Sequence, residues 1–149
     1  MRITQEADYA LRIACMLEQS GETHESAADI SERTSVSARF TLKILRKLVQ
    51  GGIVRSFKGA NGGYALARPA SEITLRDIIE LIDGPLAISR CIDSSHQCSR
   101  EGVDKSECIL YHIFCRINDE VSGKLGRLTI ADIADKDADV VRLLKKLDS

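Results

Sequence analysis

Four of the five cysteines in the chain lie close together in the sequence, at Cys91, Cys98, Cys108 and Cys115. Thiolates bind zinc and other soft metals, and accessible thiols also carry out redox chemistry. An odd number of cysteines argues against a framework of disulfides, and the crowding of four of them favours metal binding or redox chemistry. The fifth, Cys15, stands apart in a predicted helix, where we expect it to be a small buried hydrophobic side chain.

Length and composition limit the class of protein. The chain has 149 residues and a formal net charge of −1, enough for one compact domain or a small domain with an oligomerisation arm. No apolar run approaches the roughly 18 residues of a membrane span, so a membrane protein is excluded. Charged residues occupy the N-terminal positions where a signal peptide would be apolar, and we therefore expect a cytoplasmic protein with reduced thiols.

The charge is unevenly distributed along the chain. Residues 33–71 contain eight basic residues and no acidic residue. Residues 1–68 hold 10 basic and 7 acidic residues, a net charge of +3, whereas residues 69–149 hold 11 and 15, a net charge of −4. A phosphate backbone would be attracted to the first half, although a basic run also occurs as an ordinary solvated face. The pattern of secondary structure has to decide between these two interpretations.

The first half of the chain predicts three helices followed by a β-hairpin. The expected helices span residues 4–20, 27–34 and 38–50, and the expected strands span residues 53–57 and 64–67. A short Ser35-Val36-Ser37 turn separates the second and third helices, and a glycine-rich loop joins the strands. This order is the winged helix-turn-helix plan, in which the second helix of the motif enters the major groove of DNA and the hairpin contacts the backbone or minor groove.

The helix at 38–50 separates apolar from basic side chains around its axis. At 100° per residue, the residues expected on the inner side are Ala38, Thr41, Leu42, Leu48 and Val49, and those expected outside are Arg39, Phe40, Lys43, Lys47 and Gln50. The predicted DNA-binding residues are Ser37, Arg39, Phe40, Lys43, Arg46 and Lys47 from this helix and Lys58, Asn61 and Gly62 from the wing.

These residues have different expected roles at the DNA. Ser37 is expected to cap the helix and to donate to a phosphate. Arg39 and Lys43 are best placed for base edges, and Arg46 and Lys47 for phosphates. An exposed Phe40 would either meet a thymine methyl group or pack beneath the wing.

The second half predicts a short helix, a cysteine-bearing loop and a long helix. Thr74 and Asp77 have the spacing of a capping box, and Gly84-Pro85 ends the helix that follows. An amphipathic helix over about 108–128 repeats apolar residues every four positions and is expected to pair with its twin in a homodimer. The expected fold is therefore mainly α with a small β-hairpin wing. Its segments are a winged helix-turn-helix domain (1–85), a cysteine-bearing loop (86–107) and a dimerisation helix with a C-terminal tail (108–149).

Three stretches of the sequence are distinctive together: DYALR at 8–12, GANGGYALARP at 59–69 and EITLRDIIELIDGP at 72–85. They resemble the IscR, NsrR, RirA and CymR family of bacterial regulators, and the similarity extends over residues 1 to about 135. The resemblance implies a homodimeric winged-helix transcription factor, usually a repressor, whose long helix forms the dimer. Many members bind an iron–sulfur cluster through three cysteines in the loop before that helix, whereas others, like CymR, bind none.

Carried over by position, the cluster cysteines of the family correspond to Cys91, Cys98 and Cys108. Asp8 matches an acidic position that supplies a fourth ligand from the partner chain. Nine residues separate Cys98 from Cys108, more than is typical of cluster-bearing members, so a 2Fe–2S and a 4Fe–4S cluster both stay open. Cys115 lies about 10 Å along the helix from Cys108, too far for the same compact site, and is expected to pack.

Two other interpretations of the cysteines remain. Cys108 and His112, four residues apart on one helix, suit a Zn²⁺ site completed by Cys91 and Cys98. Alternatively, the cysteines are redox thiols without a metal. His96 is expected to face solvent in either case.

The sequence thus predicts a homodimeric regulator that binds double-stranded DNA and senses iron–sulfur status, redox state or nitric oxide through an iron–sulfur cluster. The alternative is the same DNA-binding fold without a cluster, regulated by thiols, a zinc site or a partner protein. An enzyme such as a thiol oxidoreductase is not expected, because the chain has no Cys-x-x-Cys pair and no evident Ser/His/Asp grouping.

Overall fold

Capping residues set the boundaries of the helices in the first half of the chain. The computed structural model describes residues 2–93, 96, 98, 102 and 104–148. Side chains of Thr4 and Ser26 accept backbone N–H hydrogen bonds at the starts of α1 (Gln5–Gln19) and α2 (Ala27–Thr34). Ser35 adopts a left-handed conformation, with φ 55°, and turns the chain into α3 (Ala38–Gln50). The predicted helix-turn-helix is confirmed.

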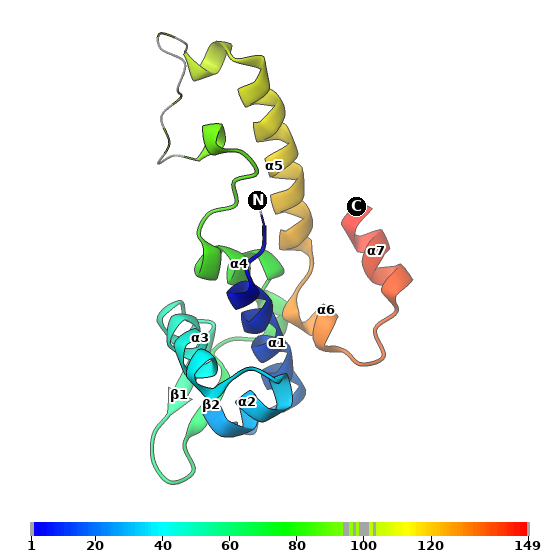
Figure 1. Cartoon of the computed structure of the whole chain (residues 1–149). Coiled ribbons are helices and arrows are strands. Elements are labelled where there is room, and N and C mark those ends of the chain that lie inside the picture. The colour runs from blue at the N-terminus through cyan, green and yellow to red at the C-terminus, as the bar shows by residue number, and fades with distance from the viewer. Residues whose placement is uncertain (1, 94–95, 97, 99–101, 103, 149) are drawn as a thin grey trace.

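One apolar core holds these helices together. Its fully buried side chains include Ile13 from α1, Ile30 from α2, and Ile44, Leu45 and Leu48 from α3. Burying an aliphatic side chain of this size contributes about 1.5–3 kcal/mol to folding. The core therefore fixes the orientation of α3 relative to α1 (Figure 1). It thereby also fixes the direction of the side chains on the opposite face of α3.

The wing is a two-stranded antiparallel hairpin of β1 (Val54–Phe57) and β2 (Gly63–Leu66), in which Val54 lies opposite Leu66. Its second strand is attached to the link before α2 close to the hairpin loop, because Glu25 and Tyr64 exchange backbone hydrogen bonds of 3.0 and 2.8 Å. Gly63 is needed there, since a Cβ at this position would lie 2.7 Å from the Glu25 carbonyl oxygen. The predicted hairpin is confirmed, with each strand starting one residue away from its expected position.

The capping box predicted for α4 (Leu75–Asp83) is present, with reciprocal hydrogen bonds between Thr74 and Asp77. After α4 the chain leaves the helix-turn-helix body and returns along α5 (Ile109–Arg127), which projects from that body as an arm (Figure 1). Short 3₁₀ turns occur at η1 (Ala70–Glu72), η2 (Arg90–Ile92) and η3 (Lys105–Glu107). None of the described helices is both long and apolar enough to cross a membrane.

Two further helices follow α5, where the sequence predicts only a tail. The first, α6 (Ile130–Ala134), is capped by a second box between Thr129 and Asp132 and buries Ile130 completely. Backbone hydrogen bonds from Ile130 to Ile73 and from Leu75 to Leu128 join this segment to the residues around α4. The second, α7 (Val140–Asp148), lies beside α5, and the Arg127 guanidinium donates to its Leu147 carbonyl at 3.0 Å. After α5, the chain thus returns to the helix-turn-helix body through α6 and then packs α7 along α5.

Candidate functional site

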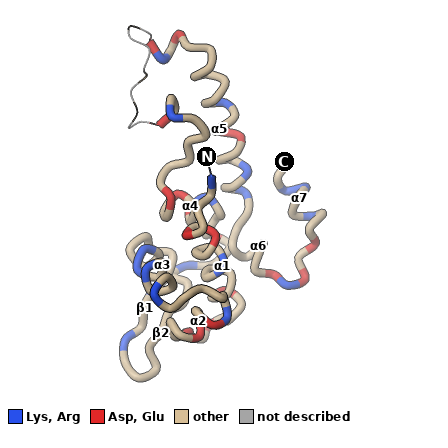
Figure 2. Tube along the Cα trace, in the orientation of Figure 1, with Lys and Arg blue, Asp and Glu red and all other residues tan. Residues whose placement is uncertain are grey.

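The face of α3 turned away from the core carries exposed basic side chains. Figure 2 marks Lys and Arg positions in blue along this helix. Arg39, Lys43 and Arg46 are exposed there, and they line a shallow hollow together with Phe40 and Leu42. At the tip of the wing, Lys58 and Asn61 are exposed as well. The helix-turn-helix body therefore presents cations from two separate elements.

The exposed face of α3 is rotated from the predicted one. Leu42, expected inside, is 39% exposed, whereas Phe40, expected outside, is half-buried with its ring 5.9 Å from that of Tyr9 in an edge-on contact. The N-terminal half of α1 covers the side of α3 that carries Phe40 and Lys47, so the free surface shifts toward Leu42. Ala38, also expected inside, is exposed at the helix start. Phe40 therefore packs against α1, and neither a contact with a thymine methyl group nor packing beneath the wing describes its environment.

Ser37 occupies the N-cap position of α3, but its side chain makes no capping hydrogen bond. The expectation that Ser37 caps the helix is therefore wrong. Its ψ of 146° directs the chain into the helix, while its exposed hydroxyl is left out of the helix end. The first-turn N–H groups of α3 lie at this end of the helix, where an anion is favoured.

Several cations of the acid-free stretch are paired with acids from outside it. Glu6 forms ion pairs with both Lys43, at 2.9 Å, and Lys47, at 2.8 Å. Burial raises the pKa of Glu6, but the hydrogen bonds and charges of Lys47 and Lys43 outweigh this effect, and the pKa lies below its ordinary value. Sequence distance conceals this contact, because Glu6 lies 37 residues before Lys43.

Arg33 and Arg68 are also paired, with Glu25 at 2.9 Å and with Asp77 at 3.5 Å. By contrast, no described carboxylate lies within 4.0 Å of the cationic groups of Arg39, Arg46 or Lys58. Among the predicted DNA-binding residues, these three are the cations without an acidic partner within the described part of the chain.

The loop that precedes α5 is attached to this helix near both of its ends. Near its start, the Ile88 N–H donates to the Asn118 side chain of α5 at 3.2 Å, and the Cys91 sulfur lies 3.1 Å from the Ser89 hydroxyl. At its end, Cys108 is half-buried as the N-cap of α5. Residues 94–95, 97, 99–101 and 103 of this loop lie outside the described residues.

The chemistry of the cysteines fits an iron–sulfur cluster, because Cys91, Cys98 and Cys108 supply three thiols from one loop. Among the described residues, no group of three or more His, Cys, Asp or Glu side chains is arranged to hold a metal ion. Cys98 is exposed, whereas Cys91 and Cys108 are half-buried. Asp8 is half-exposed and forms an ion pair of 2.7 Å with Arg12.

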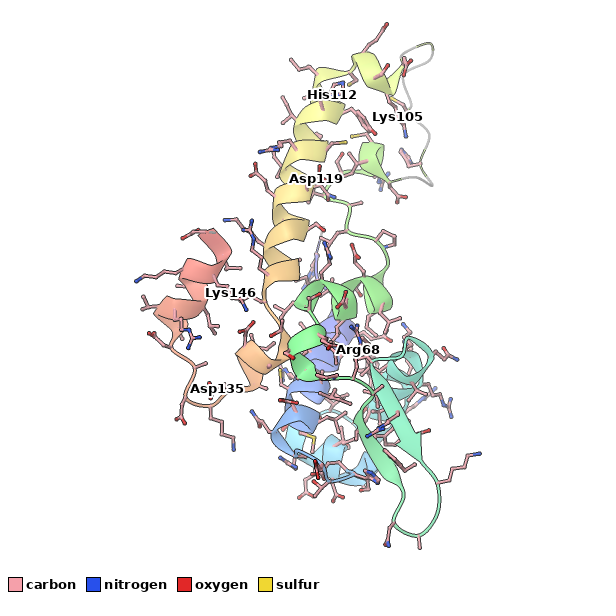
Figure 3. The ribbon with its side chains drawn as sticks, turned by 180° about the vertical axis from the view of Figure 1, so that it is seen from behind. Arg68, Lys105, His112, Asp119, Asp135 and Lys146 are labelled. Carbon is pink, nitrogen blue, oxygen red and sulfur yellow. The ribbon has the colours of Figure 1, made fainter. Side chains whose placement is uncertain are left out.

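Other polar residues surround the half-buried thiols. The Nε2 atom of His112 lies 2.7 Å from the Ser106 carbonyl oxygen, so this nitrogen donates there and is not free to bind zinc (Figure 3). Cys115 is half-buried and hydrogen-bonded to Tyr111, and this bond, together with the nearby thiols, raises the pKa of Tyr111. The pattern of the sequence did not single out Ser89 or Tyr111, because their contacts depend on how the loop lies against α5. His96 is exposed, as predicted.

The environment of Cys15 confirms that it is a packing residue. Its side chain is half-buried against the core, and burial raises its pKa to about 11. At pH 8 only about one such thiol in a thousand is ionised, and the thiolate is the nucleophile. We therefore expect iodoacetamide to alkylate Cys15 at least tenfold more slowly than exposed Cys98 in the metal-free protein. Peptide mass mapping over a time course measures both rates, and equal rates would contradict the buried environment.

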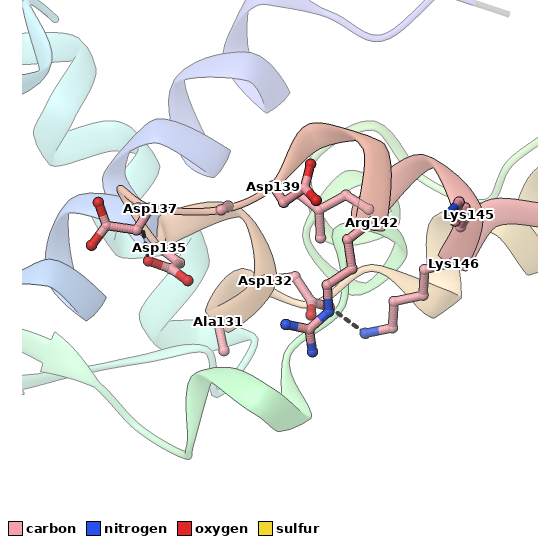
Figure 4. Close-up of a pocket in the computed structure, with 10 residues that line it drawn as sticks. Ala131, Asp132, Asp135, Asp137, Asp139, Arg142, Lys145 and Lys146 are labelled. Atoms are coloured by element: carbon pink, nitrogen blue, oxygen red, sulfur yellow. Dashed lines mark hydrogen bonds and ion pairs between the residues drawn. The ribbon is translucent and has the colours of Figure 1, made fainter.

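A second hollow lies between α6 and α7 and is lined mainly by charged side chains (Figure 4). Lys146 forms an ion pair of 2.5 Å with Asp132. Burial raises the pKa of Asp132, but the hydrogen bonds from Lys146 and Thr129 outweigh this effect. The pKa therefore lies below its ordinary value, and the carboxylate is charged at neutral pH. The residues that line this hollow include no thiol, imidazole or hydroxyl group. The ion pair between Lys146 and Asp132 holds α7 against α6, and the charged residues of the hollow provide no nucleophile.

Sequence comparisons identify relatives of the chain. The profile of the Rrf2 family, described as "Iron-dependent Transcriptional regulator", matches residues 3–136. The HTH-type transcriptional regulator IscR of Serratia proteamaculans is 30% identical over 138 residues, which cover 91% of this chain and 80% of that protein. Protein aau3 of Rhizobium meliloti is 36% identical over 94 residues, which cover 63% of this chain and 61% of that protein.

Solved structures share the fold. CymR of Bacillus subtilis matches with a TM-score of 0.71 and 27% identity, covering 90% of this chain and 96% of that one. The oxidised form of CymR from Staphylococcus aureus matches with a TM-score of 0.68 and 27% identity, covering 91% and 97% of the two chains. IscR of T. potens has a TM-score of 0.69 at 24% identity, covering 95% and 91%, and supports the fold. The mainly helical architecture with a small hairpin is therefore confirmed.

Proposed function

The chain belongs to the Rrf2 family of transcriptional regulators, which are not enzymes, and from this premise we propose that it is a homodimeric repressor that reads DNA through α3 and the wing. The observation that carries the proposal is the outward face of the helix-turn-helix body, where Arg39, Arg46 and Lys58 have no acidic partner among the described residues. Unpaired cations on a recognition helix and on a hairpin suit two neighbouring stretches of phosphate backbone.

Each element has a distinct role in this proposal. Arg39, near the N-terminus of α3, reads a base edge in the major groove, and Lys43 lies one turn further along. Arg46 and Lys47 hold phosphates, and the Ser37 hydroxyl donates to a phosphate at the end of the helix. In the wing, Lys58 contacts the backbone together with Asn61 and Gly62.

Exposed apolar residues on α5 support a homodimer. Ile109 is 73% exposed, and Ile113 and Ile117, which follow at helical spacing, are 47% and 43% exposed. A stripe of large aliphatic side chains on the surface marks an interaction site, and a second copy of α5 carries the complementary apolar stripe. The two recognition helices of the dimer would then meet half-sites about 34 Å apart.

For the sensing function, we propose that Cys91, Cys98 and Cys108 hold an iron–sulfur cluster, with Asp8 of the partner subunit as the fourth ligand. Such a cluster supplies a group that reacts with oxygen or nitric oxide and thereby reports on iron–sulfur status. The chain's own contribution is the anchoring of the loop at both ends of the cysteine segment. Ser89 and Asn118 hold the start of the loop and Cys108 caps α5, so a change in the loop acts directly on the proposed dimerisation helix.

The alternative is the same regulator without a cluster, controlled by its thiols, a zinc site or a partner protein. Two observations favour it: the described cysteines do not converge on a metal site, and the CymR structures have the same fold. Zinc would have to bind the Nδ1 atom of His112, because the Nε2 atom donates to the Ser106 carbonyl, as the second ring nitrogen of a metal-bound histidine commonly does.

The ultraviolet–visible spectrum of protein prepared without oxygen, combined with assays for iron, sulfide and zinc, tests the cluster. We expect visible absorbance and matching amounts of iron and sulfide in the wild-type protein. Cys108→Ala should abolish this absorbance, while Cys15→Ala, which removes a thiol from the core, should retain it. Absorbance in Cys108→Ala equal to wild type would reject the ligand assignment. Absence of iron and sulfide with stoichiometric zinc would establish the zinc alternative.

A further inference from the structure

Glu6 joins the first turn of α1 to two successive turns of the recognition helix. Its side chain is only 16% exposed, and its two carboxylate oxygens face different lysines. Lys43 donates to Oε2 at 2.9 Å, and the Lys47 ammonium forms an ion pair with Oε1 at 2.8 Å. Lys43 and Lys47 are four residues apart on α3, so both ammonium groups lie on one side of that helix. One carboxylate therefore neutralises half of the positive charge on this side.

Neighbouring contacts fix the position of this carboxylate. The Thr4 side chain caps α1 by accepting from the Ala7 N–H at 3.2 Å, and the Thr4 N–H donates to Asp83 of α4 at 3.0 Å. The edge-on contact between Tyr9 and Phe40 closes the space between α1 and α3 next to the ion pairs. The contact between Glu6 and the two lysines is thus a part of the folded body and is held by three elements.

This arrangement divides the cations of α3 into two groups. Arg39 and Arg46 have no acidic partner among the described residues, whereas Lys43, Lys47 and Glu6 together carry a net charge of +1. Contacts to phosphates supply affinity that does not depend on sequence, and each cation that neutralises a phosphate adds about 0.9 to the salt slope on duplex DNA. A carboxylate placed beside two of the cations reduces this sequence-independent part of the affinity.

We propose that Glu6 is a specificity-determining positioning residue, which acts through Lys43 and Lys47 to lower the affinity of the protein for DNA of arbitrary sequence. The inference rests on the proposed function, because it assumes that α3 faces DNA. With the lysines partly neutralised by Glu6, the base contacts made by residues such as Arg39 form a larger share of the binding energy. Discrimination between an operator and random DNA is therefore greater than the basic face alone would allow.

The test compares wild type and Glu6→Gln in fluorescence anisotropy titrations with two labelled 30-bp duplexes, at salt concentrations from 50 to 200 mM. One duplex has a random sequence, and the other is selected from a random library by the wild-type protein. Glu6→Gln preserves the shape of the side chain and removes its charge. We expect about fivefold tighter binding to the random duplex at 50 mM salt, a salt slope steeper by about 0.9, and a smaller affinity ratio between the two duplexes.

Four controls make the result specific. Glu18→Gln makes the same charge change at an exposed position about 18 Å further along α1, and it should leave the affinity for random DNA within twofold of wild type. In a Lys43→Gln/Lys47→Gln background, Glu6→Gln should have no further effect on the salt slope. Circular dichroism establishes that each variant is folded. Glu6→Ala, which also removes the carboxylate, should change the affinity for DNA in the same direction as Glu6→Gln.

The outcomes separate this inference from the proposed function. If wild type binds both duplexes with a salt-dependent affinity but Glu6→Gln binds equally tightly or more weakly, Glu6 does not restrain the lysines and the inference is overturned. Weaker binding would show instead that Glu6 holds the lysines in place for DNA. If wild type binds neither duplex in a salt-dependent manner, the proposed function fails, and the inference fails with it.

Discussion

Replacement of Ile113 and Ile117 by aspartate is expected to convert the protein from a dimer to a monomer and to weaken operator binding at least 100-fold. Both side chains are about half exposed on α5, so the substitutions remove little buried area within the chain itself. In a dimer formed through this stripe, they would place charges in an apolar interface, where an unpaired carboxylate is strongly disfavoured. Linking two half-site contacts raises overall affinity by roughly 10²–10⁴-fold, and a monomer loses this advantage.

Light scattering coupled to size-exclusion chromatography measures the mass, which should be twice the chain mass of 16.4 kDa for wild type and equal to it for the variant. Lys136→Glu is the matched control, because it changes the net charge by the same two units at an exposed position after α6. A double variant that still runs as a dimer would show that the stripe on α5 is not the interface. The exposed Val140, Val141 and Leu144 of α7 would then be the next surface to substitute.

The parts of the fold that follow from local signals were predictable from the sequence. The Ser35 turn, the Thr74–Asp77 capping box and the glycine-rich loop of the wing are all decided by a few adjacent residues. Glycine at position 63 is explained only by the structure, because the backbone of Glu25 approaches too closely for any side chain. Local chemistry therefore predicted the elements, and packing explains why particular residues are needed.

Contacts between distant segments were not predictable in the same way. The acid-free run at 33–71 suggested free cations, but Glu6 pairs with Lys43 and Lys47 from a helix that precedes the run. The rotation of the exposed face of α3 has the same origin, since α1 covers Phe40 and leaves Leu42 uncovered. A helical wheel treats α3 as if one partner covered it from one direction, whereas α1 and the rest of the core cover it from two.

The residues after α5 illustrate a related limit. Helix α6 has five residues, too few to show helical periodicity, and its position depends on the burial of Ile130 beside Ile73. For the cysteines, sequence spacing identified the donors but not their neighbours. The hydrogen bond between Cys115 and Tyr111 and the contact between His112 and Ser106 arise from the way the loop lies along α5.

Arg39→Ala and Lys58→Ala are expected to weaken DNA binding in different ways, because the two side chains occupy different elements. Arg39 is exposed near the N-terminus of α3, the end proposed to enter the major groove, and loss of a base contact there would cost about 1–3 kcal/mol, or about 5- to 150-fold in affinity. The loss should be confined to operators that carry the preferred base at one position of each half-site. Lys58→Ala, at the wing tip, should weaken all duplexes by a similar factor and reduce the salt slope by about 0.9.

Affinities for a set of operator duplexes, each with one base pair changed, and a salt series on the best duplex distinguish these two roles. Arg142→Ala on α7 removes an exposed arginine away from α3 and should leave both measurements unchanged. An equal loss on every duplex for Arg39→Ala would assign this residue to the phosphates. In that case, Lys43, whose ammonium group forms an ion pair with Glu6, would be the residue of α3 that reads bases. The unpaired cations on the exposed face of α3 would then supply affinity without sequence preference.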